Sequence, residues 1–518
     1  MTDERTEALA ERLAKTHDRN RPAMVEKRHA KGYRTARENL DDLVDTGSFT
    51  EYGQLAVAAQ RSRRDVADLE ENTPADAVIT GTGTINAELF GRENARAAVV
   101  VYDYSVLAGT QGYFHHRKLD RIFELAEQWE LPVVMYTEGG GGRPGDTDVT
   151  TQIAGLNLSS FRTWGRLSGL VPRIAINNGY CFAGNAALFG SADVTIATKT
   201  SWIGMAGPAM IEGGGLGKHA PTEIGPVEVQ EGNGVVDIVA DDEAHATDIA
   251  RRLLALHQGR TGDWECADQA AMRDLIPADR RWVYPVRDVI ETLGDTGSFI
   301  ELRRRYGAPV ITGLLRIEGR PAGLIANDCR QLGGAITAQA AEKAARFLQL
   351  CDGWGLPVLS LIDTPGFMVG PDSEQEAAVR RMSRLFVVGA NITVPILAVV
   401  LRKGYGLGAM AMAGGSLAAP VWTASWPTGE FGGMGLEGAV RLGYRKELEA
   451  VEDRAEREAL FEKLVRQMYE AGKATEAAAH LEIDAVIDPA DTRRELAGML
   501  ARLPKRGGGG GRRYVDTW

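Results

Sequence analysis

Two places in the chain combine a strand-like segment with small residues at the expected start of a helix, and both could hold a developing negative charge. Ala183 and Gly184 follow "VPRIAINNGYCF", and Leu407, Gly408 and Ala409 follow "VPILAVVLRKGYG". The first N–H groups of a helix lack intrahelical partners, so they can stabilise an oxyanion where small side chains leave them open. Small residues also suit close packing of a helix on a strand. The pattern leaves both interpretations open, and two copies suit a reaction between two carbonyl compounds.

The segment "YTEGGGGRPGDT", residues 136–147, places four consecutive glycines between an acid and an arginine. Such a run serves either as a flexible linker or as backbone that another group approaches closely. It directly follows the strand-like "LPVVMYT", and the corresponding place later in the chain holds the turn-like "DTPG", residues 363–366. A linker is not expected inside a repeated unit, so the close-approach interpretation is favoured.

Other motifs do not carry a specific signal. "GGGLGKH", residues 213–219, lacks the first glycine and the final hydroxyl residue of a phosphate-binding loop. "GYGLGA", residues 404–409, fits a dinucleotide fingerprint in form, but the acid that should follow in a later strand is missing, since Glu430 is expected in a glycine-rich turn. His115 and His116 are adjacent and face different sides of a helix, and no Ser–His–acid set or metal pattern can be nominated.

The elements that must position these residues occur twice. "DTGSF" is found at 45–49 and at 295–299, and "LPVVMYTEGGG" matches "LPVLSLIDTPG" at an offset of 225 residues. Apolar strand-like runs alternate with amphipathic helices in each copy, which predicts an α/β fold made by duplication. We expect helices over 112–130, 148–169, 336–352 and 374–390, and domains over 1–280 and 281–518.

Composition excludes several classes of partner. The 518 residues carry a formal net charge of -11, which argues against nucleic acid or an anionic membrane. The first twenty residues have a charged helical pattern rather than that of a signal peptide, and no apolar run has the length of a membrane span. The four cysteines lie far apart without CxxC, which indicates buried free thiols in a reducing compartment. The expected location is the cytoplasm.

From about residue 25 to 505 the sequence resembles the carboxyltransferase β-type subunits of biotin-dependent acyl-CoA carboxylases, the propionyl-CoA and acetyl-CoA carboxylase β family. The resemblance implies an α/β fold of two duplicated crotonase-like domains, each a ββα spiral. It rests on "KRHAKGYRTARENLDDLVDTGSFTE", "GGGGR", "IDTPGFMVG", "RKGYG", "WPTGEFGGMGLEGAV" and "EIDAVIDPADTRREL".

The resemblance also implies where substrates bind. Acyl-CoA would lie against the first domain and biotin against the second domain of a partner protomer, within a homo-oligomer that is a hexamer in the family. The thioester enolate would be held by the amides of Ala183 and Gly184, and the ureido oxygen of biotin by those of Leu407 and Gly408. The internal offset instead suggests Gly408 and Ala409 for the second pair, and this alternative stays open.

Further site residues follow from the same resemblance. "GGGGR" stands where the family has a Gly-Gly-Ala-Arg turn, so Gly140, Gly141 and Gly142 are expected at the substrate, with Arg143 as an anchor. Met410 stands where family members often carry Asp or Ile, a position that influences which acyl groups are accepted. A methionine in the core of the following helix is the alternative.

The implied reaction transfers CO2 from carboxybiotin to the α-carbon of an acyl-CoA through an enolate, without a side-chain base or a metal. Biotin would arrive on a separate carrier, because the chain has no Met-Lys-Met attachment site, and a biotin carboxylase subunit would be a second partner. The alternatives are a biotin-independent acyl-CoA decarboxylase or other crotonase-type lyase, and a non-catalytic partner chain in a mixed carboxylase.

Overall fold

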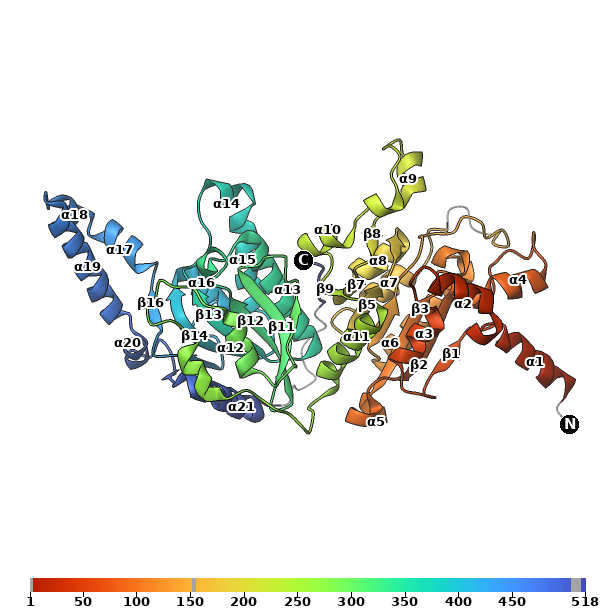
Figure 1. Ribbon diagram of the computed structural model, residues 1–518, viewed down its shortest axis with the longest axis horizontal. Helices are drawn as coiled ribbons and strands as arrows, with labels where there is room; N and C mark the ends of the chain where they lie inside the picture. Colours follow the sequence, from red (N-terminus) through yellow and green to blue (C-terminus); the bar gives the residue numbers. More distant parts are fainter. Residues whose placement is uncertain (1–2, 151–154, 505–513) are drawn as a thin grey trace. The chain divides into compact units, whose positions relative to one another are not determined.

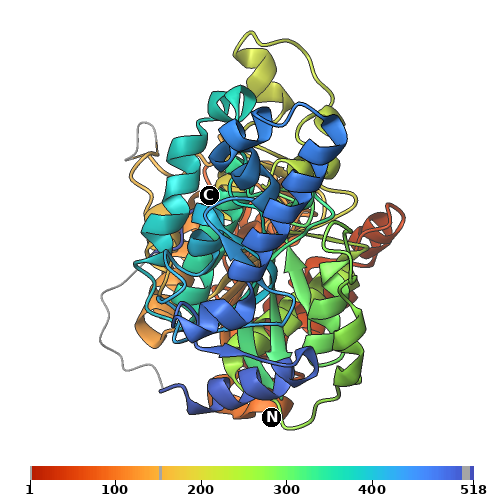
Figure 2. The same cartoon turned by 90° about the vertical axis from the view of Figure 1, so that its left-hand side faces the viewer.

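The computed structural model describes residues 3–150, 155–504 and 514–518, which form two compact units (Figures 1 and 2). Unit 1 comprises the described residues up to Gly259 and 514–517, and unit 2 those from Arg260 to 504 with Trp518. The boundary comes earlier than the residue 280 expected from the sequence, because the intervening segment belongs to unit 2. Thr261 N–H donates to Gly319 O at 3.1 Å, and Met272 is fully buried in the core of unit 2.

Unit 1 is built on a seven-stranded sheet with the order β1-β2-β3-β4-β5-β7-β9. The first three strands pair antiparallel, and all later neighbours are parallel. The strands are β1 (Thr50–Tyr52), β2 (Val78–Thr84), β3 (Arg96–Tyr102), β4 (Val133–Tyr136), β5 (Arg173–Asn177), β7 (Val194–Thr198) and β9 (Ile238–Ala240). A separate parallel pair is formed by β6 (Tyr180–Phe182) and β8 (Trp202–Gly204).

The helices of unit 1 follow the strands in the alternation expected of an α/β fold. They are α1 (Glu4–Ala14), α2 (Pro22–His29), α3 (Ala36–Leu43), α4 (Val66–Asn72), α5 (Ala87–Asn94), α6 (Tyr113–Trp129), α7 (Ser160–Arg166), α8 (Gly184–Gly190), α9 (Pro208–Gly213), α10 (Val227–Gly232) and α11 (Glu243–Gln258). Figure 1 shows α9 extending away from the sheet of this unit.

Unit 2 repeats the design with the strand order β10-β11-β12-β13-β14-β15-β17, and β16 pairs with β14. The first three strands are again antiparallel and the rest parallel. The strands are β10 (Ile300–Leu302), β11 (Val310–Ile317), β12 (Arg320–Asn327), β13 (Val358–Thr364), β14 (Ile396–Tyr405), β15 (Trp422–Ser425), β16 (Glu430–Gly432) and β17 (Ala485–Val486). Glu430 therefore begins a strand, contrary to the turn expected from its glycine-rich surroundings.

The helices of unit 2 include an extension that leaves the sheet. They are α12 (Val286–Leu293), α13 (Ala338–Trp354), α14 (Pro371–Gln375), α15 (Ala378–Gly389), α16 (Gly406–Met412), α17 (Leu436–Gly443), α18 (Arg445–Glu449), α19 (Arg454–Ala471), α20 (Ala474–Ala479) and α21 (Thr492–Arg502). Helices α17 to α19 project from the body of the unit in Figure 1 and face the viewer in Figure 2. Among the residues described, no helix is long and apolar enough to cross a membrane.

Two of the four helices predicted from the sequence match in extent, and two are shorter. Helices α6 and α13 confirm the predictions over 112–130 and 336–352. In the span 148–169 only α7 forms, with 151–154 outside the described residues. The span 374–390 is divided into α14 and α15 because Ala377 adopts φ 57°, a conformation that cannot continue an α-helix.

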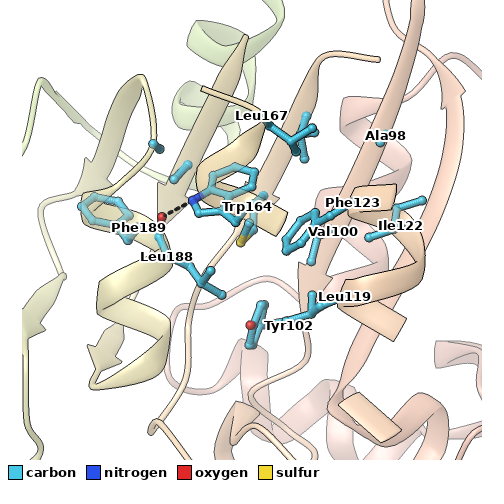
Figure 3. Packing of buried hydrophobic residues seen from close by; sticks show 14 of the residues in the cluster. Ala98, Val100, Tyr102, Leu119, Ile122, Phe123, Trp164, Leu167, Leu188 and Phe189 are labelled. Carbon is cyan, nitrogen blue, oxygen red and sulfur yellow. Dashed lines mark hydrogen bonds between the residues drawn. The ribbon is translucent and has the colours of Figure 1, made fainter. Parts of the chain in front are cut away.

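The core of unit 1 packs α6, α7 and α8 against the sheet, with Trp164 at its centre (Figure 3). Trp164 is 1% exposed, its ring centroid lies 5.1 Å from that of Phe123, and its Nε1 donates to Leu188 O at 3.0 Å. One side chain thereby connects α6, α7 and α8. Trp129, at the end of α6, is 43% exposed.

Trp164→Ala is expected to lower the free energy of unfolding by about 3–5 kcal/mol, because it removes a large buried side chain and leaves a cavity. Urea unfolding of the full chain measures the change, with the half-exposed Trp129→Ala as control. Equal losses of stability in the two variants would contradict the central position assigned to Trp164.

Candidate active site

The glycine run forms a tight, hydrogen-bonded turn at the end of β4. Gly139 donates its N–H to Tyr180 O at 2.7 Å and accepts the N–H of Phe182 at 3.0 Å, which joins the turn to β6. On the other side, Gly140 N–H donates to Ala108 O at 3.0 Å. Backbone that is bonded on two sides within one unit is not a linker.

The glycines of the turn differ in the space around them. A Cβ on Gly139 would lie 2.1 Å from Asn185 Nδ2, and a Cβ on Gly141 would lie 2.7 Å from Ala183 Cβ. Gly141 also has φ +89°, which favours glycine. Around Gly142, by contrast, nothing lies within 4 Å of the Cβ position. The turn therefore requires glycine at 139 and 141, whereas position 142 has room for a side chain.

The buried Arg143 side chain connects the glycine turn to neighbouring segments by hydrogen bonds. Its side chain is 6% exposed, its Nε donates to Asp146 Oδ1 at 2.8 Å, and its Nη2 donates to Asp146 Oδ2 at 3.0 Å and Asp76 Oδ1 at 2.5 Å. Nη1 donates to Thr110 O at 3.2 Å. The guanidinium is thus an internal anchor of the glycine turn.

Helix α8 begins directly beside this turn and presents unused amides. Ala183, with φ 52° and ψ -119°, donates its N–H to Gly204 O at 3.0 Å, so this amide is not open to a substrate. The next two amides, of Gly184 and Asn185, have no acceptor among the described residues. The buried Asn185 side chain accepts the N–H of Gly141 at 3.1 Å and so joins the turn to the helix start.

In unit 2, the turn that corresponds to the glycine run is separated from the strand before the next helix by two residues fewer than in unit 1. Thr364 lies opposite Gly404 at the end of β13, as Gly139 lies opposite Cys181 at the end of β4. Thr364 follows Gly139 by 225 residues, but Gly404 follows Cys181 by only 223. The offset of 225 found in the sequence therefore does not hold where the second helix begins.

When the two units are aligned by these strand pairings, Leu407 and Gly408 correspond to Gly184 and Asn185. Neither the Leu407 nor the Gly408 N–H has an acceptor in the part of the chain that the structure describes. The shared register favours these two amides over the alternative of Gly408 and Ala409.

Backbone conformation agrees with this correspondence. Gly406, with φ +55°, occupies the place of Ala183 before the two amides. A Cβ on Gly408 would lie 2.7 Å from Gly366 Cα, so here backbone packs directly on backbone. Leu407 is 61% exposed beside the turn.

A cavity of about 400 Å³ lies within unit 2, at the end of β14 and beside α16. Met410 lines it and is 37% exposed, unlike the fully buried Met412 on the same helix. The side chain is therefore not part of the core. The rest of the lining includes two carboxylates and consists of Gly404, Gly406, Ala409, Leu417, Phe431, Gly432, Gly433, Ala471, Gly472, Glu476, Ala477, His480 and Glu482.

Titratable groups behind the first turn are buried and held by protein groups. Burial raises the pKa of Glu138 to about 7, although Arg28 Nη2 donates to its carboxylate at 2.8 Å. Burial also lowers the pKa of His115 well below its ordinary value and that of Lys118 to about 8. Lys118 Nζ donates to Ala75 O at 2.9 Å. These side chains support the backbone and are engaged elsewhere than at the open amides.

Ser160, Asp120 and His116 form a cluster that the spacing of these residues in the sequence did not predict. The Ser160 hydroxyl donates to Asp120 Oδ1 at 2.6 Å and lies 3.0 Å from His116 Nδ1. Ser160 is fully buried and the acid contacts the serine instead of the histidine, so this set lacks the arrangement of a nucleophilic triad. Within the described ranges, no group of three His, Cys, Asp or Glu side chains could hold a metal ion.

Comparison with known proteins identifies the family. Residues 27–506 match the carboxyl transferase domain. The chain is 33% identical to the methylmalonyl-CoA carboxyltransferase 12S subunit of Propionibacterium freudenreichii subsp. shermanii, over 96% of this chain and 93% of that one. It is 31% identical to the propionyl-CoA carboxylase beta chain of Saccharopolyspora erythraea, over 95% and 93% of the two chains.

Solved structures agree in fold. A single-chain, multi-domain long-chain acyl-CoA carboxylase matches with a TM-score of 0.91 and 55% identity, over 96% of this chain and 49% of that one, so this chain spans about half its length. Transcarboxylase 12S matches with a TM-score of 0.84 and 30% identity, over 99% of both chains.

The fold is thus that of the carboxyltransferases built from two crotonase-like α/β units. The chain belongs to the carboxyl transferase family. It is an enzyme, the carboxyltransferase component of an acyl-CoA carboxylase.

Gly141→Ala is expected to push α8 away from the glycine turn, because the new Cβ meets Ala183 and φ is unfavourable for alanine. A displacement of catalytic groups by about 1 Å can cost roughly 100-fold in rate. Gly142→Ala has open space and should keep wild-type turnover, which makes it a matched control. Turnover of the two folded variants measures the difference, and equal activities would show that the turn tolerates a side chain at 141.

Proposed function

We propose that the chain carboxylates the α-carbon of an acyl-CoA with two pairs of backbone amides. The amides of Gly184 and Asn185 hold the thioester oxygen, and those of Leu407 and Gly408 hold the ureido oxygen of biotin. The observation that carries the proposal is that both pairs are open and occupy matched positions in the two units. The first pair starts one residue later than the sequence suggested, because the Ala183 N–H is already bonded.

The amides act on the charge that develops during transfer. When the α-proton leaves, negative charge gathers on the thioester oxygen, and two N–H donors stabilise the resulting enolate more than the neutral thioester. The α-carbon then forms a bond to CO2, and the charge moves to the new carboxylate. Carboxybiotin on its carrier supplies the CO2 and, after releasing it, a nitrogen that accepts the α-proton. No side-chain base of this chain is required.

The open N–H groups at the second turn suit the ureido oxygen of a biotin ring. The N–H of the buried Gly408 has no acceptor within the described residues, and Leu407 beside it is exposed. An open amide pair suits a ureido oxygen, which is a strong acceptor. Gly140, Gly141 and Gly142 line the corresponding first turn, where Arg143 fixes the backbone instead of contacting the acyl-CoA.

We assign acyl-CoA to unit 1 of one protomer and biotin to unit 2 of a partner protomer, as the family resemblance implies. A biotin carboxylase and a biotin carboxyl carrier subunit are the partners that the reaction needs. Transcarboxylase 12S is described as a hexamer, which supports a hexameric assembly of this chain as well. The buried thiols of this chain, Cys181, Cys329 and Cys351, suit a reducing cytoplasm.

The acyl group that this site fits best is a long chain. The match of 55% identity to a long-chain acyl-CoA carboxylase supports this choice. Leu407 and Met410 add apolar, exposed surface at the second turn, and Met410 opens onto the cavity. A flexible methionine can adapt to an alkyl chain, whereas a carboxylate at this position would lose hydration against it.

The purified chain should move a carboxyl group from malonyl-CoA or methylmalonyl-CoA to free biotin or a biotinyl domain without ATP. It should not carboxylate acyl-CoA from ATP and bicarbonate alone, because that step belongs to a partner. Production of carboxybiotin and loss of malonyl-CoA are measured together. Decarboxylation with no dependence on biotin would instead assign the chain to the lyases.

Met410→Asp is expected to reduce kcat/KM for palmitoyl-CoA relative to propionyl-CoA, by roughly 10- to 200-fold at most. The new carboxylate would place a charge beside the alkyl chain of an acyl-CoA bound to unit 1 of the partner protomer. The control is Leu442→Asp, which changes an exposed apolar residue of α17 that does not line the cavity. An unchanged ranking of acyl-CoA substrates in folded Met410→Asp would remove Met410 from the acyl site.

A further inference from the structure

A buried ion pair links the N-terminal helix α2 to the first glycine turn. Arg28 Nη1 and Nη2 donate to Glu138 Oε1 and Oε2 at 3.2 and 2.8 Å, and the two side chains are 11% and 6% exposed. The third guanidinium nitrogen of Arg28, Nε, donates to Arg34 O at 3.1 Å. This two-pronged contact uses the full geometry of the guanidinium, which lysine cannot reproduce.

Glu138 has almost no freedom to move independently of the active site. It immediately precedes Gly139, whose N–H and C=O bond Tyr180 and Phe182 in the strand that leads to α8. A Cβ on Gly179 would lie 2.3 Å from Glu138 Oε1, so the carboxylate fills the space beside that strand. A shift of Glu138 is therefore transmitted to both segments that form the first amide pair.

Unit 2 has an acid–arginine pair at the equivalent position. Asp363, which precedes Thr364, accepts from Arg402 Nη2 at 3.0 Å, and the two side chains are 0% and 2% exposed. The Tyr284 hydroxyl also donates to this carboxylate at 2.8 Å. The arginine comes from strand β14 in unit 2 but from helix α2 in unit 1. The acid occupies the same position in both units, but its arginine comes from a different element in each. The pair is therefore not simply a contact retained from the duplication, which indicates that the turn needs it.

We propose that Arg28 is a positioning residue for carboxyl transfer, because it holds Glu138 and the glycine turn so that the Gly184 and Asn185 amides stay fixed. The inference rests on the proposed role of those two amides. It adds that the activity depends on the docking of α2, a segment outside the sheet. Arg28 touches none of the reacting atoms.

The local charges favour an arginine at this place. Arg28 stacks on the ring of Tyr33, with its guanidinium carbon 4.8 Å from the centroid, and 5.8 Å from that of Tyr104. The neighbouring acid Glu243 accepts from the Arg34 N–H at 2.6 Å. Removing Arg28 therefore leaves the Glu138 carboxyl buried without its cation, and the turn has to adjust.

The pair Arg173–Asp193 provides a matched control in the same unit. Arg173 Nη2 lies 2.7 Å from Asp193 Oδ1, and the side chains are 2% and 0% exposed. Arg173 begins β5, at the opposite end of that strand from the glycine turn. Arg173→Gln thus breaks a buried ion pair of the same type without touching the turn.

The experiment compares Arg28→Gln, Arg28→Lys and Arg173→Gln in the full chain with its biotinyl acceptor. We expect Arg28→Gln to lower kcat by about 100-fold with little change in the Kd for acyl-CoA. Arg28→Lys should recover part of the rate, because the charge remains but one of the two parallel hydrogen bonds is lost. Arg173→Gln should lower Tm while the folded protein keeps the wild-type kcat.

Hydrogen–deuterium exchange gives a readout that does not depend on turnover. Peptides covering 138–143 and 180–186 should exchange faster in Arg28→Gln than in Arg173→Gln. An inactive wild type would overturn the proposed function, whereas an active wild type with unchanged kcat and exchange in Arg28→Gln overturns this inference alone. If Arg28→Gln does not fold, Arg28→Lys decides, since wild-type kcat and exchange in that variant contradict the proposal.

Discussion

Two hydrogen bonds between Gly139 and strand β6 decide where helix α8 can present open amides. They use the N–H groups of Gly139 and Phe182, and the Ala183 N–H is also bonded, so the first open donors fall at Gly184 and Asn185. An amide without a partner in a protein interior costs about 1–3 kcal/mol. Complete bonding of the surrounding backbone therefore leaves unsatisfied donors at the start of α8, where we propose that a substrate oxygen binds.

The two units reach this arrangement by different packing. In unit 1 the Asn185 side chain bonds the N–H of Gly141 and spans the distance between turn and helix. In unit 2 Gly408 has no side chain and its Cα region approaches the Gly366 backbone directly. Duplication thus preserved the position of the amides but not the contacts that hold them. Equivalent positions in the two halves will consequently respond differently to the same substitution.

The sequence was sufficient for the duplicated α/β design, the long helices α6 and α13 and the glycine turn, because each has a strong local pattern. It was insufficient where distant strands decide. The acceptor of the Ala183 N–H is Gly204 on β8, and the offset of 223 residues at the second turn follows from the pairing of β13 with β14. Neither contact has a signature in the residues around it. The same holds for Arg28 and Glu138, which are separated by 110 positions and meet only in the folded unit.

A site made of backbone amides separates reaction from specificity. Any residue contributes the same N–H, so the donors constrain side chains only through packing, as at Gly408, and the chemistry survives extensive sequence change. In the proposed site the choice of acyl group would then come from side chains at the rim, where Leu407 and Met410 are exposed. This division is consistent with a chain about 30% identical to its relatives that keeps the carboxyltransferase fold.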